Sequence, residues 1–255
     1  MKIYHGVILG LVQGLTEFLP ISSSGHILLA EGLMGVSGGL FFSLALHLGT
    51  LLSVVVFMRG KIAGVLKDKT QLKMLGVATI PAGVVGVLFA DAVDRLFFGG
   101  QFICIGFLIT ATSLFFCERL SKRRACNKML NFKGSVALGV AQGVAVIPAI
   151  SRSGSIFACG VAMGYQKSEL ADFTFLMSIP IIAGGVVYEL LKMLLGGGFI
   201  QTGLIMPILF GGLSAFLSGL IALEWTKNAF INGKLWHFAL YLCLLSLTII
   251  VVGGI

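Results

Sequence analysis

The sequence predicts an all-α polytopic membrane protein with six full transmembrane helices and two re-entrant helical hairpins, arranged as an inverted-topology repeat. The chain has 255 residues, of which 57% are hydrophobic and 11% charged, and its mean hydropathy is +1.04. These values exclude an ordinary soluble domain. Apolar stretches of about 20 residues, long enough to cross a membrane as a helix, recur along the whole chain. Two further apolar segments are interrupted by polar patches that resemble each other.

Six segments have the length and composition of full membrane spans. They cover residues 40–58, 74–90, 102–117, 170–191, 204–223 and 236–252. Two other apolar segments, 3–34 and 135–164, carry a patch of Pro, Ser and Gly near their middle. Such a patch cannot face lipid, because its unpaired backbone groups would each cost several kcal/mol in hydrocarbon. Both segments are therefore predicted to turn back within the protein as re-entrant hairpins.

Loop charges predict the orientation in the membrane. Basic residues gather in 59–73 and 118–133, so both connections are predicted to be cytoplasmic. The connection 91–100 has two acidic residues and one basic residue, and 196–203 has no charge, which fits the outer side. This threading puts the C-terminus outside. The cytoplasmic loops account for the net charge of +8, so nucleic acid is not expected as a partner.

A shift of 129 residues aligns the two interrupted segments without gaps and gives eight identities, which extend from Gly10 to Ile27 in the first copy. Each half then has one hairpin followed by three spans, and because three is odd the second half is inverted. We predict a first repeat over 1–118, a basic cytoplasmic linker over 119–134 and a second repeat over 135–255. The first hairpin enters from outside and the second from the cytoplasm, so that their tips meet near the midplane.

The first hairpin holds an acid where its surroundings are almost wholly apolar. Gln13 and Glu17 are four residues apart and share one helix face. An ionisable residue at membrane depth indicates a functional site. Carboxylate and amide oxygens suit a hard cation, so we expect Gln13 and Glu17 to bind a divalent metal ion, Mg²⁺ or Ca²⁺. Pro20 then ends the helix.

The serines that follow are predicted to begin the next helix. Ser22, Ser23 and Ser24 are good N-cap residues, and the free N–H groups of a helix N-terminus bind anions. Ser23 and His26 are three residues apart and lie on one face of the first turn. The imidazole could activate the hydroxyl or attack phosphorus itself, and the sequence leaves both possibilities open.

The second hairpin repeats this pattern and adds a cation. Ser151 and Ser153 repeat the N-cap pattern, and Arg152 between them carries a planar guanidinium that suits phosphate oxygens. Two helix N-termini and Arg152 would form a cationic pocket for two linked phosphates. His47 is expected to be a hydrogen-bonded packing residue, and Tyr188 an interfacial residue.

These residues resemble the bacterial undecaprenyl-diphosphate phosphatase family, also called bacitracin-resistance proteins. Gln13 and Glu17 match its E/Q-x-x-x-E element, and the segment from Pro20 to His26 matches P-x-S-S-[ST]-G-H. The segment beginning at Pro148 matches P-G-x-S-R-S-G-x-[ST], with alanine at position 149 in place of glycine and Ser-Ile at 155–156 where a threonine is common. The resemblance covers nearly the whole chain.

The resemblance implies metal-dependent hydrolysis of a C55 polyprenyl diphosphate to the monophosphate and inorganic phosphate. This reaction recycles the lipid carrier of peptidoglycan synthesis and confers bacitracin resistance. It implies a multi-pass protein of the bacterial inner (plasma) membrane whose active site opens to the periplasmic side, with membrane lipids and a second copy, as a homodimer, as further partners. The implied catalytic residues are Glu17, Ser23, His26 and Arg152, and the implied phosphate-binding residues are Ser22, Ser24, Gly25, Ser151, Ser153 and Gly154.

A second class of function stays open at this stage. Inverted repeats with helices broken at the midplane also build secondary transporters, so the chain could be a polyprenyl-phosphate flippase or transporter. Phosphate release in detergent, where there is no membrane to cross, distinguishes an enzyme from a transporter. The other membrane lipid-phosphatase superfamily is disfavoured, because the sequence has no K-x6-R-P element.

Overall fold

The computed structural model describes residues 1–97, 102–195 and 202–252, with the backbone alone described over 89–97. These residues form ten α-helices, one short 3₁₀ helix and a single isolated bridge between Lys128 and Tyr165. The helices are α1 Ile3–Phe18, α2 Ser23–Met34, α3 Gly39–Lys67, α4 Lys69–Phe97, α5 Ile103–Arg123, α6 Phe132–Val144, α7 Arg152–Met163, α8 Lys167–Leu195, α9 Ile205–Asn232 and α10 Trp236–Val252. The predicted all-α class is confirmed.

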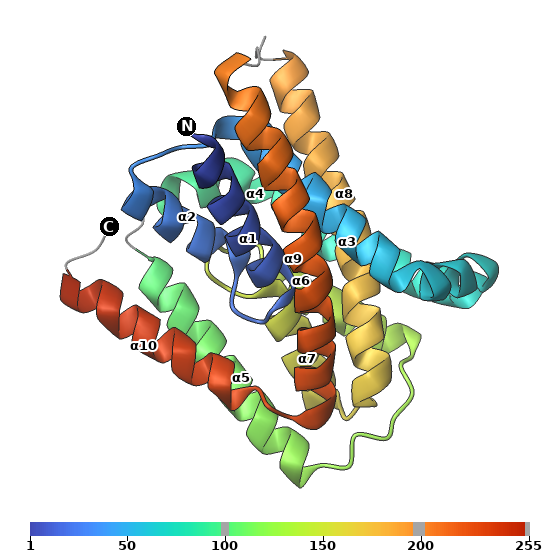
Figure 1. Cartoon of the computed structure of the whole chain (residues 1–255). Coiled ribbons are helices and arrows are strands. Elements are labelled where there is room, and N and C mark those ends of the chain that lie inside the picture. Colours follow the sequence, from blue (N-terminus) through green and yellow to red (C-terminus); the bar gives the residue numbers. More distant parts are fainter. Residues whose placement is uncertain (98–101, 196–201, 253–255) are drawn as a thin grey trace.

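Helix order repeats along the described chain: two short helices are followed by three longer ones, and the same order then begins again at α6. Figure 1 shows α5 and α10 side by side along one flank, whereas α3 and α4 extend to the opposite side. The short helix α1 packs on α9, and α6 packs on α4. Each interrupted segment is therefore covered by long helices from the other half of the chain.

Five helices of the described residues, α3, α4, α5, α8 and α9, are long and apolar enough to cross a membrane. The sixth predicted span forms α10 at its predicted bounds, but this apolar helix has only 17 described residues. The long helices extend beyond the predicted apolar stretches, as α3 does from residue 58 to Lys67, because backbone hydrogen bonding continues into polar residues outside hydrocarbon. The predicted outer connections 91–100 and 196–203 lie almost wholly outside the described side chains.

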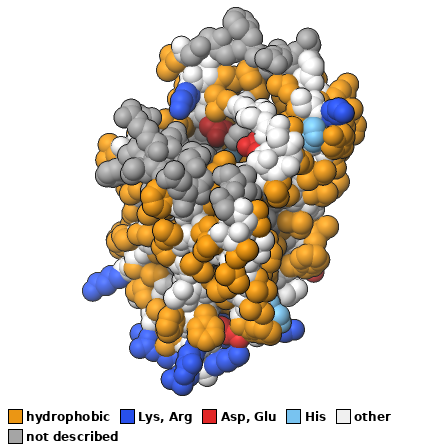
Figure 2. All heavy atoms as spheres, turned by 90° about the vertical axis from the view of Figure 1, so that its left-hand side faces the viewer, with side chains coloured by type: hydrophobic (Ala, Val, Ile, Leu, Met, Phe, Trp, Pro, Cys, Tyr) orange, Lys and Arg blue, Asp and Glu red, His pale blue; other side chains and the backbone are white. Residues whose placement is uncertain are grey.

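The surface fits a multi-pass membrane protein. Figure 2 shows hydrophobic side chains over most of one face, with Lys and Arg gathered at its lower end. Large apolar residues are exposed along every long helix whose side chains are described, and so large an apolar surface requires lipid or protein to cover it. Exposed basic residues lie at and after the end of α5, including Lys122, Arg123, Arg124 and Lys128.

Small residues bring α1 close to α9. Gly6, Gly10 and Gly14 recur every four residues on one face of α1, and a side chain at any of them would overlap the backbone of α9. The carbonyl oxygens met are those of Pro207, Gly211 and Ala215. Close helix contact through small residues is the usual packing mode in membranes. It fixes the C-terminal end of α1, where Glu17 lies, against the long helix.

Ion pairs join the ends of the long helices. The Asp172 carboxylate on α8 binds Lys61 Nζ of α3 at 3.2 Å and Lys227 Nζ of α9 at 2.7 Å. Glu118 of α5 binds Lys122 Nζ at 2.6 Å and accepts a hydrogen bond from the backbone N–H of Trp236 at 2.6 Å. The second contact ties α5 to the first residue of α10. These pairs hold the helix ends in register around the interior.

Candidate active site

The two turns that interrupt the short helix pairs lie against each other. Residues 19–22 join α1 to α2, and residues 145–151 join α6 to α7. The backbone N–H of Ala149 donates to Ser24 Oγ at 3.3 Å, and Ser153 Oγ donates to the carbonyl oxygen of Leu19 at 3.4 Å. Residues separated by about half the chain therefore form one polar region.

Each turn contains one strained residue. Ser22 has a φ of 72° and Ala149 a φ of 65°, and they are the only non-glycine residues with positive φ in the described chain. Such a conformation costs about 1–3 kcal/mol. Position 149 is where the resembling family has glycine, the residue that adopts this conformation without cost. Ser22, although first in line to cap α2, makes no side-chain capping bond, because its backbone turns away from the usual N-cap geometry.

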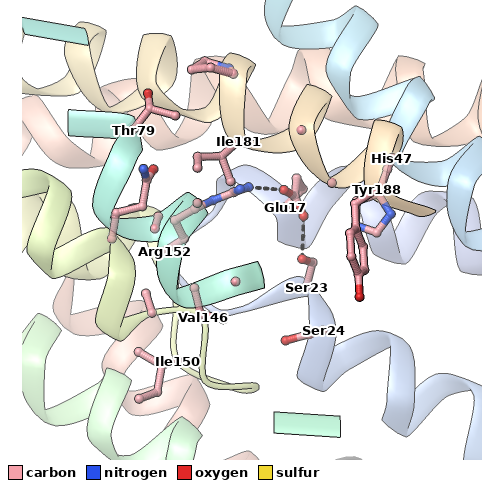
Figure 3. A pocket seen from close by; sticks show the side chains of 18 of the residues that line it. Glu17, Ser23, Ser24, His47, Thr79, Val146, Ile150, Arg152, Ile181 and Tyr188 are labelled. Carbon is pink, nitrogen blue, oxygen red and sulfur yellow. Dashed lines mark hydrogen bonds and ion pairs between the residues drawn. The ribbon is translucent and has the colours of Figure 1, made fainter. Parts of the chain in front are cut away.

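Gln13, Glu17, Ser23 and Arg152, four of the predicted residues, form one hydrogen-bonded cluster, and Figure 3 shows Glu17 between Arg152 and Ser23. Glu17 Oε1 forms an ion pair with the guanidinium of Arg152. Glu17 Oε2 accepts hydrogen bonds from Ser23 Oγ at 2.5 Å and from Gln13 Nε2 at 3.1 Å. The Glu17 side chain is only 5% exposed, and a carboxylate so buried requires such partners. The predicted meeting of Glu17 with Arg152 across the two hairpins is observed.

The predicted phosphate-binding residues make different contacts in the structure. Ser151 caps α7, with its Oγ accepting from the Gly154 N–H at 3.2 Å, so one predicted helix N-terminus is capped by its own serine. Ser24 Oγ lies 3.2 Å from Ser22 Oγ. Gly25 instead serves packing, because a Cβ there would overlap the ring of Phe107.

The cluster lies at the polar end of a cavity of about 490 Å³. Its other walls come from α4, from α8 and from the turn that joins α6 to α7, and they are mainly apolar; they include Ala82, Gly83, Gly86, Val87, Val146, Ile150, Ile181, Gly184 and Gly185. No described atom lies within 4 Å of a Cβ placed on any of the four glycines. These glycines therefore leave the cavity open. A charged group with an apolar extension would match both ends of it.

His26 does not face this cavity. Its Nδ1 is 2.7 Å from the carbonyl oxygen of Ser22, and its Nε2 is 2.9 Å from the hydroxyl of Tyr241 on α10. The ring also stacks with Tyr241 and contacts Phe107 at a centroid distance of 5.0 Å. Both ring nitrogens are thus engaged away from Glu17. The structure brings Glu17, Ser23 and Arg152 together and places the imidazole of His26 behind the first turn.

Sequence reasoning missed four polar residues of the cavity, one of which is Thr79 of α4. His47 has the hydrogen bond expected of it, from Nδ1 to the Ser43 carbonyl oxygen at 3.0 Å, yet its ring lines the cavity. Tyr188 of α8 lines it as well. Gln142 is 1% exposed, and its Oε1 has no hydrogen-bond partner among the described residues. The alignment of Gln142 with Gln13 in the repeat was the available signal.

The protein oxygens of the cavity fit a metal ion that is held partly by the phosphates of a bound substrate. Both oxygens of Glu17 already accept hydrogen bonds, and Gln13 turns its NH₂ group toward them. Over the described residues no group of three or more His, Cys, Asp or Glu could enclose a metal. Gln142 Oε1, which has no hydrogen-bond partner among the described residues, would be one further oxygen ligand. Mg²⁺ is commonly held by one or two carboxylates, water and substrate phosphates, and this arrangement suits it better than Ca²⁺, which takes more protein oxygens.

This chain is similar to known proteins over nearly its whole length. The model of the family described as bacitracin resistance protein BacA matches residues 6–248. The protein named undecaprenyl-diphosphatase of Carboxydothermus hydrogenoformans is 36% identical, with 99% of this chain and 98% of that protein aligned. Proteins of the same name from Bacteroides fragilis, 36% identical with 99% of each chain aligned, and from Methanobrevibacter smithii, 35% identical with 100% of this chain and 99% of that protein aligned, are also similar.

These matches extend through both interrupted segments and therefore include Glu17, Ser23 and Arg152. They also reach the long helices of both halves, so the likeness is one of the whole chain and not of a motif. The chain belongs to the bacitracin resistance protein BacA family.

Proposed function

We propose that this protein is an undecaprenyl-diphosphatase, which hydrolyses a C55 polyprenyl diphosphate to the monophosphate and inorganic phosphate. One observation carries the proposal: Glu17, Ser23 and Arg152 meet at the polar end of a cavity whose remaining walls are mainly apolar. That combination suits a diphosphate head group on a prenyl chain. The names of the relatives support the same reaction. Recycling of the lipid carrier for peptidoglycan synthesis, and with it bacitracin resistance, follows from this activity.

Ser23 is the proposed nucleophile. Its Oγ, 2.5 Å from Glu17 Oε2, attacks the terminal phosphorus while the carboxylate takes its proton, an arrangement of nucleophile and adjacent base. The bond from that phosphorus to the bridging oxygen breaks, and polyprenyl monophosphate leaves. Water then hydrolyses the phosphoserine, with the protonated Glu17 returning its proton to Ser23. The sequence leaves His26 open as an alternative nucleophile; both its ring nitrogens have partners outside the cavity, which favours Ser23.

Arg152 supplies the positive charge for the phosphates. Its guanidinium is held beside the cavity by Glu17, and the planar fork can contact two phosphate oxygens at once. Charge that develops on the transferred phosphoryl group is then stabilised by a donor already in place. Ser151 and Ser24 line the same cavity and offer hydroxyl groups to the remaining oxygens.

A divalent metal ion, Mg²⁺ in preference to Ca²⁺, is proposed as cofactor, with Glu17 and the free Oε1 of Gln142 as its protein ligands. Gln13 orients Glu17 through its amide N–H. When bound, the ion offsets the negative charge of the diphosphate. The sequence predicts Gln13 and Glu17 as the metal ligands. We propose Gln142 in place of Gln13 as a ligand, because Oε1 of Gln142 has no hydrogen-bond partner among the described residues.

The arrangement of the helices in the membrane is also a proposal. Two re-entrant hairpins, α1–α2 and α6–α7, with six spans in an inverted repeat, would explain why the order of short and long helices occurs twice in the described chain. The basic end seen in Figure 2 supports a cytoplasmic side. We propose the bacterial inner membrane as the location, with the active site open to the periplasmic side. A homodimer stays a prediction that the mass of the protein–detergent complex would check.

Phosphate release tests the function. The purified full chain in detergent should release phosphate from undecaprenyl diphosphate, and chelation of divalent ions should stop the release. Restoration by Mg²⁺ should exceed restoration by Ca²⁺. A chain that releases no phosphate in detergent, yet moves polyprenyl phosphate across vesicle membranes, would be a flippase and not this enzyme.

A further inference from the structure

His47 stands between two cavities. It lines the cavity of Glu17 and Arg152, and it also lines a second cavity of about 700 Å³ together with Ser23, Glu31 and Glu189. Figure 3 shows His47 and Tyr188 on the side of Glu17 opposite to Arg152. The cavity that holds the proposed nucleophile therefore has an imidazole on its wall, and this imidazole belongs to His47 and not to His26.

The hydrogen bonds of His47 fix the role of each ring nitrogen. Nδ1 faces the carbonyl oxygen of Ser43 at 3.0 Å. A carbonyl can only accept, so Nδ1 carries a hydrogen and donates it. Nε2 has no hydrogen-bond partner among the described residues. When the ring is protonated, Nε2–H is a donor that a ligand in the cavity can use.

A carboxylate stands behind the ring. Ser43 Oγ lies 3.4 Å from His47 Nδ1 and donates to Glu189 Oε1 of α8 at 3.3 Å. The other oxygen of Glu189 is buried and has no partner among the described residues. The order acid, hydroxyl, imidazole therefore holds the ring in place at the edge of the cavity.

From this geometry we propose that His47 is a further catalytic residue, the general acid that donates its Nε2 proton to the departing polyprenyl monophosphate. The inference rests on the proposed hydrolase function. Ser43 and Glu189 are positioning residues, because they act through the ring. Histidine is suited to the task, since its charge changes between about pH 5 and pH 8 and a phosphate monoester takes up a proton near pH 6.

The step balances without a further reactant. As Ser23 Oγ forms its bond to the terminal phosphorus, the bond from that phosphorus to the bridging oxygen breaks and its electron pair stays on the bridging oxygen. That oxygen takes the proton from Nε2, which leaves His47 neutral and the monophosphate with one negative charge fewer. Solvent reprotonates Nε2 before the next turnover.

The pH profile of turnover tests the assignment. Groups that face His47 are Glu17 of α1, Glu31 of α2, Arg152 of α7, and Tyr188 and Glu189 of α8. Since a general acid must be protonated, kcat for undecaprenyl diphosphate should fall toward alkaline pH in the parent chain. His47→Gln keeps a hydrogen-bonding side chain but cannot titrate, so kcat should drop about 10²-fold and lose its alkaline decline.

His237→Gln is the matched control. His237 is exposed at the start of α10 and its variant should retain the full profile. Glu189→Gln should alter the alkaline decline, because Glu189 acts on the ring through Ser43. In His47→Ala, free imidazole in the buffer should restore part of the activity, which a packing role would not permit.

The outcomes separate this inference from the proposed function. A parent chain without phosphatase activity contradicts the function itself. An active parent whose His47→Gln variant keeps both the turnover and the alkaline decline overturns the general acid alone. Should His47→Gln prove unstable in detergent, two other measurements test the inference: the pH profile of kcat for Glu189→Gln and the response of His47→Ala to imidazole. If that profile is unaltered and imidazole restores no activity, His47 is not the general acid.

Discussion

Ser23 and Arg152 occupy equivalent positions of the 129-residue repeat and bind the two oxygens of one carboxylate, Glu17. Equivalent positions in two copies of one motif have thus diverged into a hydroxyl and a guanidinium. The same shift equates Glu17 with Val146, which lines the apolar wall of the same cavity. One copy of the motif supplies the acid and the proposed nucleophile, whereas the other supplies the cation and part of the apolar wall.

Removal of the Ser23 hydroxyl should abolish turnover. Ser23→Ala is expected to lose roughly 10³-fold or more in kcat, as with other nucleophile deletions, because no other group lies 2.5 Å from the Glu17 carboxylate in position to attack. Acid-quenched enzyme should carry acid-stable phosphate on the peptide containing Ser23. Ser214→Ala, which removes a hydroxyl bonded only within α9, is the control. An acid-labile phosphoenzyme that persists in Ser23→Ala would assign the attack to His26 instead.

Arg152→Lys should lower kcat strongly, although it keeps the positive charge. Lysine keeps the charge but not the planar fork, and loss of a preorganised donor to the reacting group costs about 10²–10³-fold in kcat. Arg59→Lys, at an exposed position in the second half of α3, should leave kcat unchanged. Steady-state phosphate release measures both. Equal activity of Arg152→Lys and the parent chain would mean that only charge, and not the fork, is used.

His26 is expected to support the first turn and not to react. Tyr241→Phe removes the partner of His26 Nε2, and the loss of one hydrogen bond should lower unfolding free energy by about 1 kcal/mol and kcat by less than tenfold. His26→Ala should lose more stability, since the ring also binds the Ser22 carbonyl. Thermal unfolding in detergent and phosphate release give the two values. A fully stable His26→Ala with no activity would restore a catalytic role to this residue.

Glycines on α8 should set the space for the prenyl chain. Gly184→Leu places a side chain in the apolar part of the cavity, where no described atom lies near, so KM for the C55 substrate should rise about tenfold or more with kcat less affected, since lost uniform binding appears in KM. Gly76→Leu on the exposed face of α4 is the control. An unchanged KM in Gly184→Leu would place the prenyl chain elsewhere.

Contact between α1 and α9 should be intolerant of a larger residue. Gly10→Val forces a branched side chain against the Gly211 carbonyl, and overpacking of this kind costs about 1–3 kcal/mol. The thermal midpoint in detergent should fall accordingly. Gly76→Val, with no neighbour within 4 Å, separates the effect of packing from that of replacing glycine in a helix. If both variants unfold at the same temperature, the tight contact is absent.

Much of this arrangement was predictable because it depends on local composition and on charge. Runs of apolar residues identify the long helices, since a membrane requires backbone hydrogen bonds to be closed within each segment. The repeat brings Arg152 to Glu17, because an acid and a guanidinium at matched hairpin tips have few other partners inside a membrane protein.

The remaining features depend on how the helices pack. His47 faces the cavity only because the opposite face of α3 is turned toward α9, where a Cβ at Gly49 would overlap the Gly212 carbonyl, and sequence does not disclose this rotation. His26 leaves the site because Ser22 adopts a positive φ and offers its carbonyl oxygen to the ring. Tyr241, its other partner, is 215 residues away along the chain, and no repeat or motif connects them.

A double-mutant cycle between Glu17→Gln and Arg152→Lys is the most direct measurement of whether the two turns form one active centre. The kcat/KM for undecaprenyl diphosphate is determined for the parent chain, both single variants and the double variant. Because the two side chains contact each other and are proposed to act on the same diphosphate, the double variant should be far less impaired than the product of the single losses. Losses that simply multiply would show two independent sites and contradict the account.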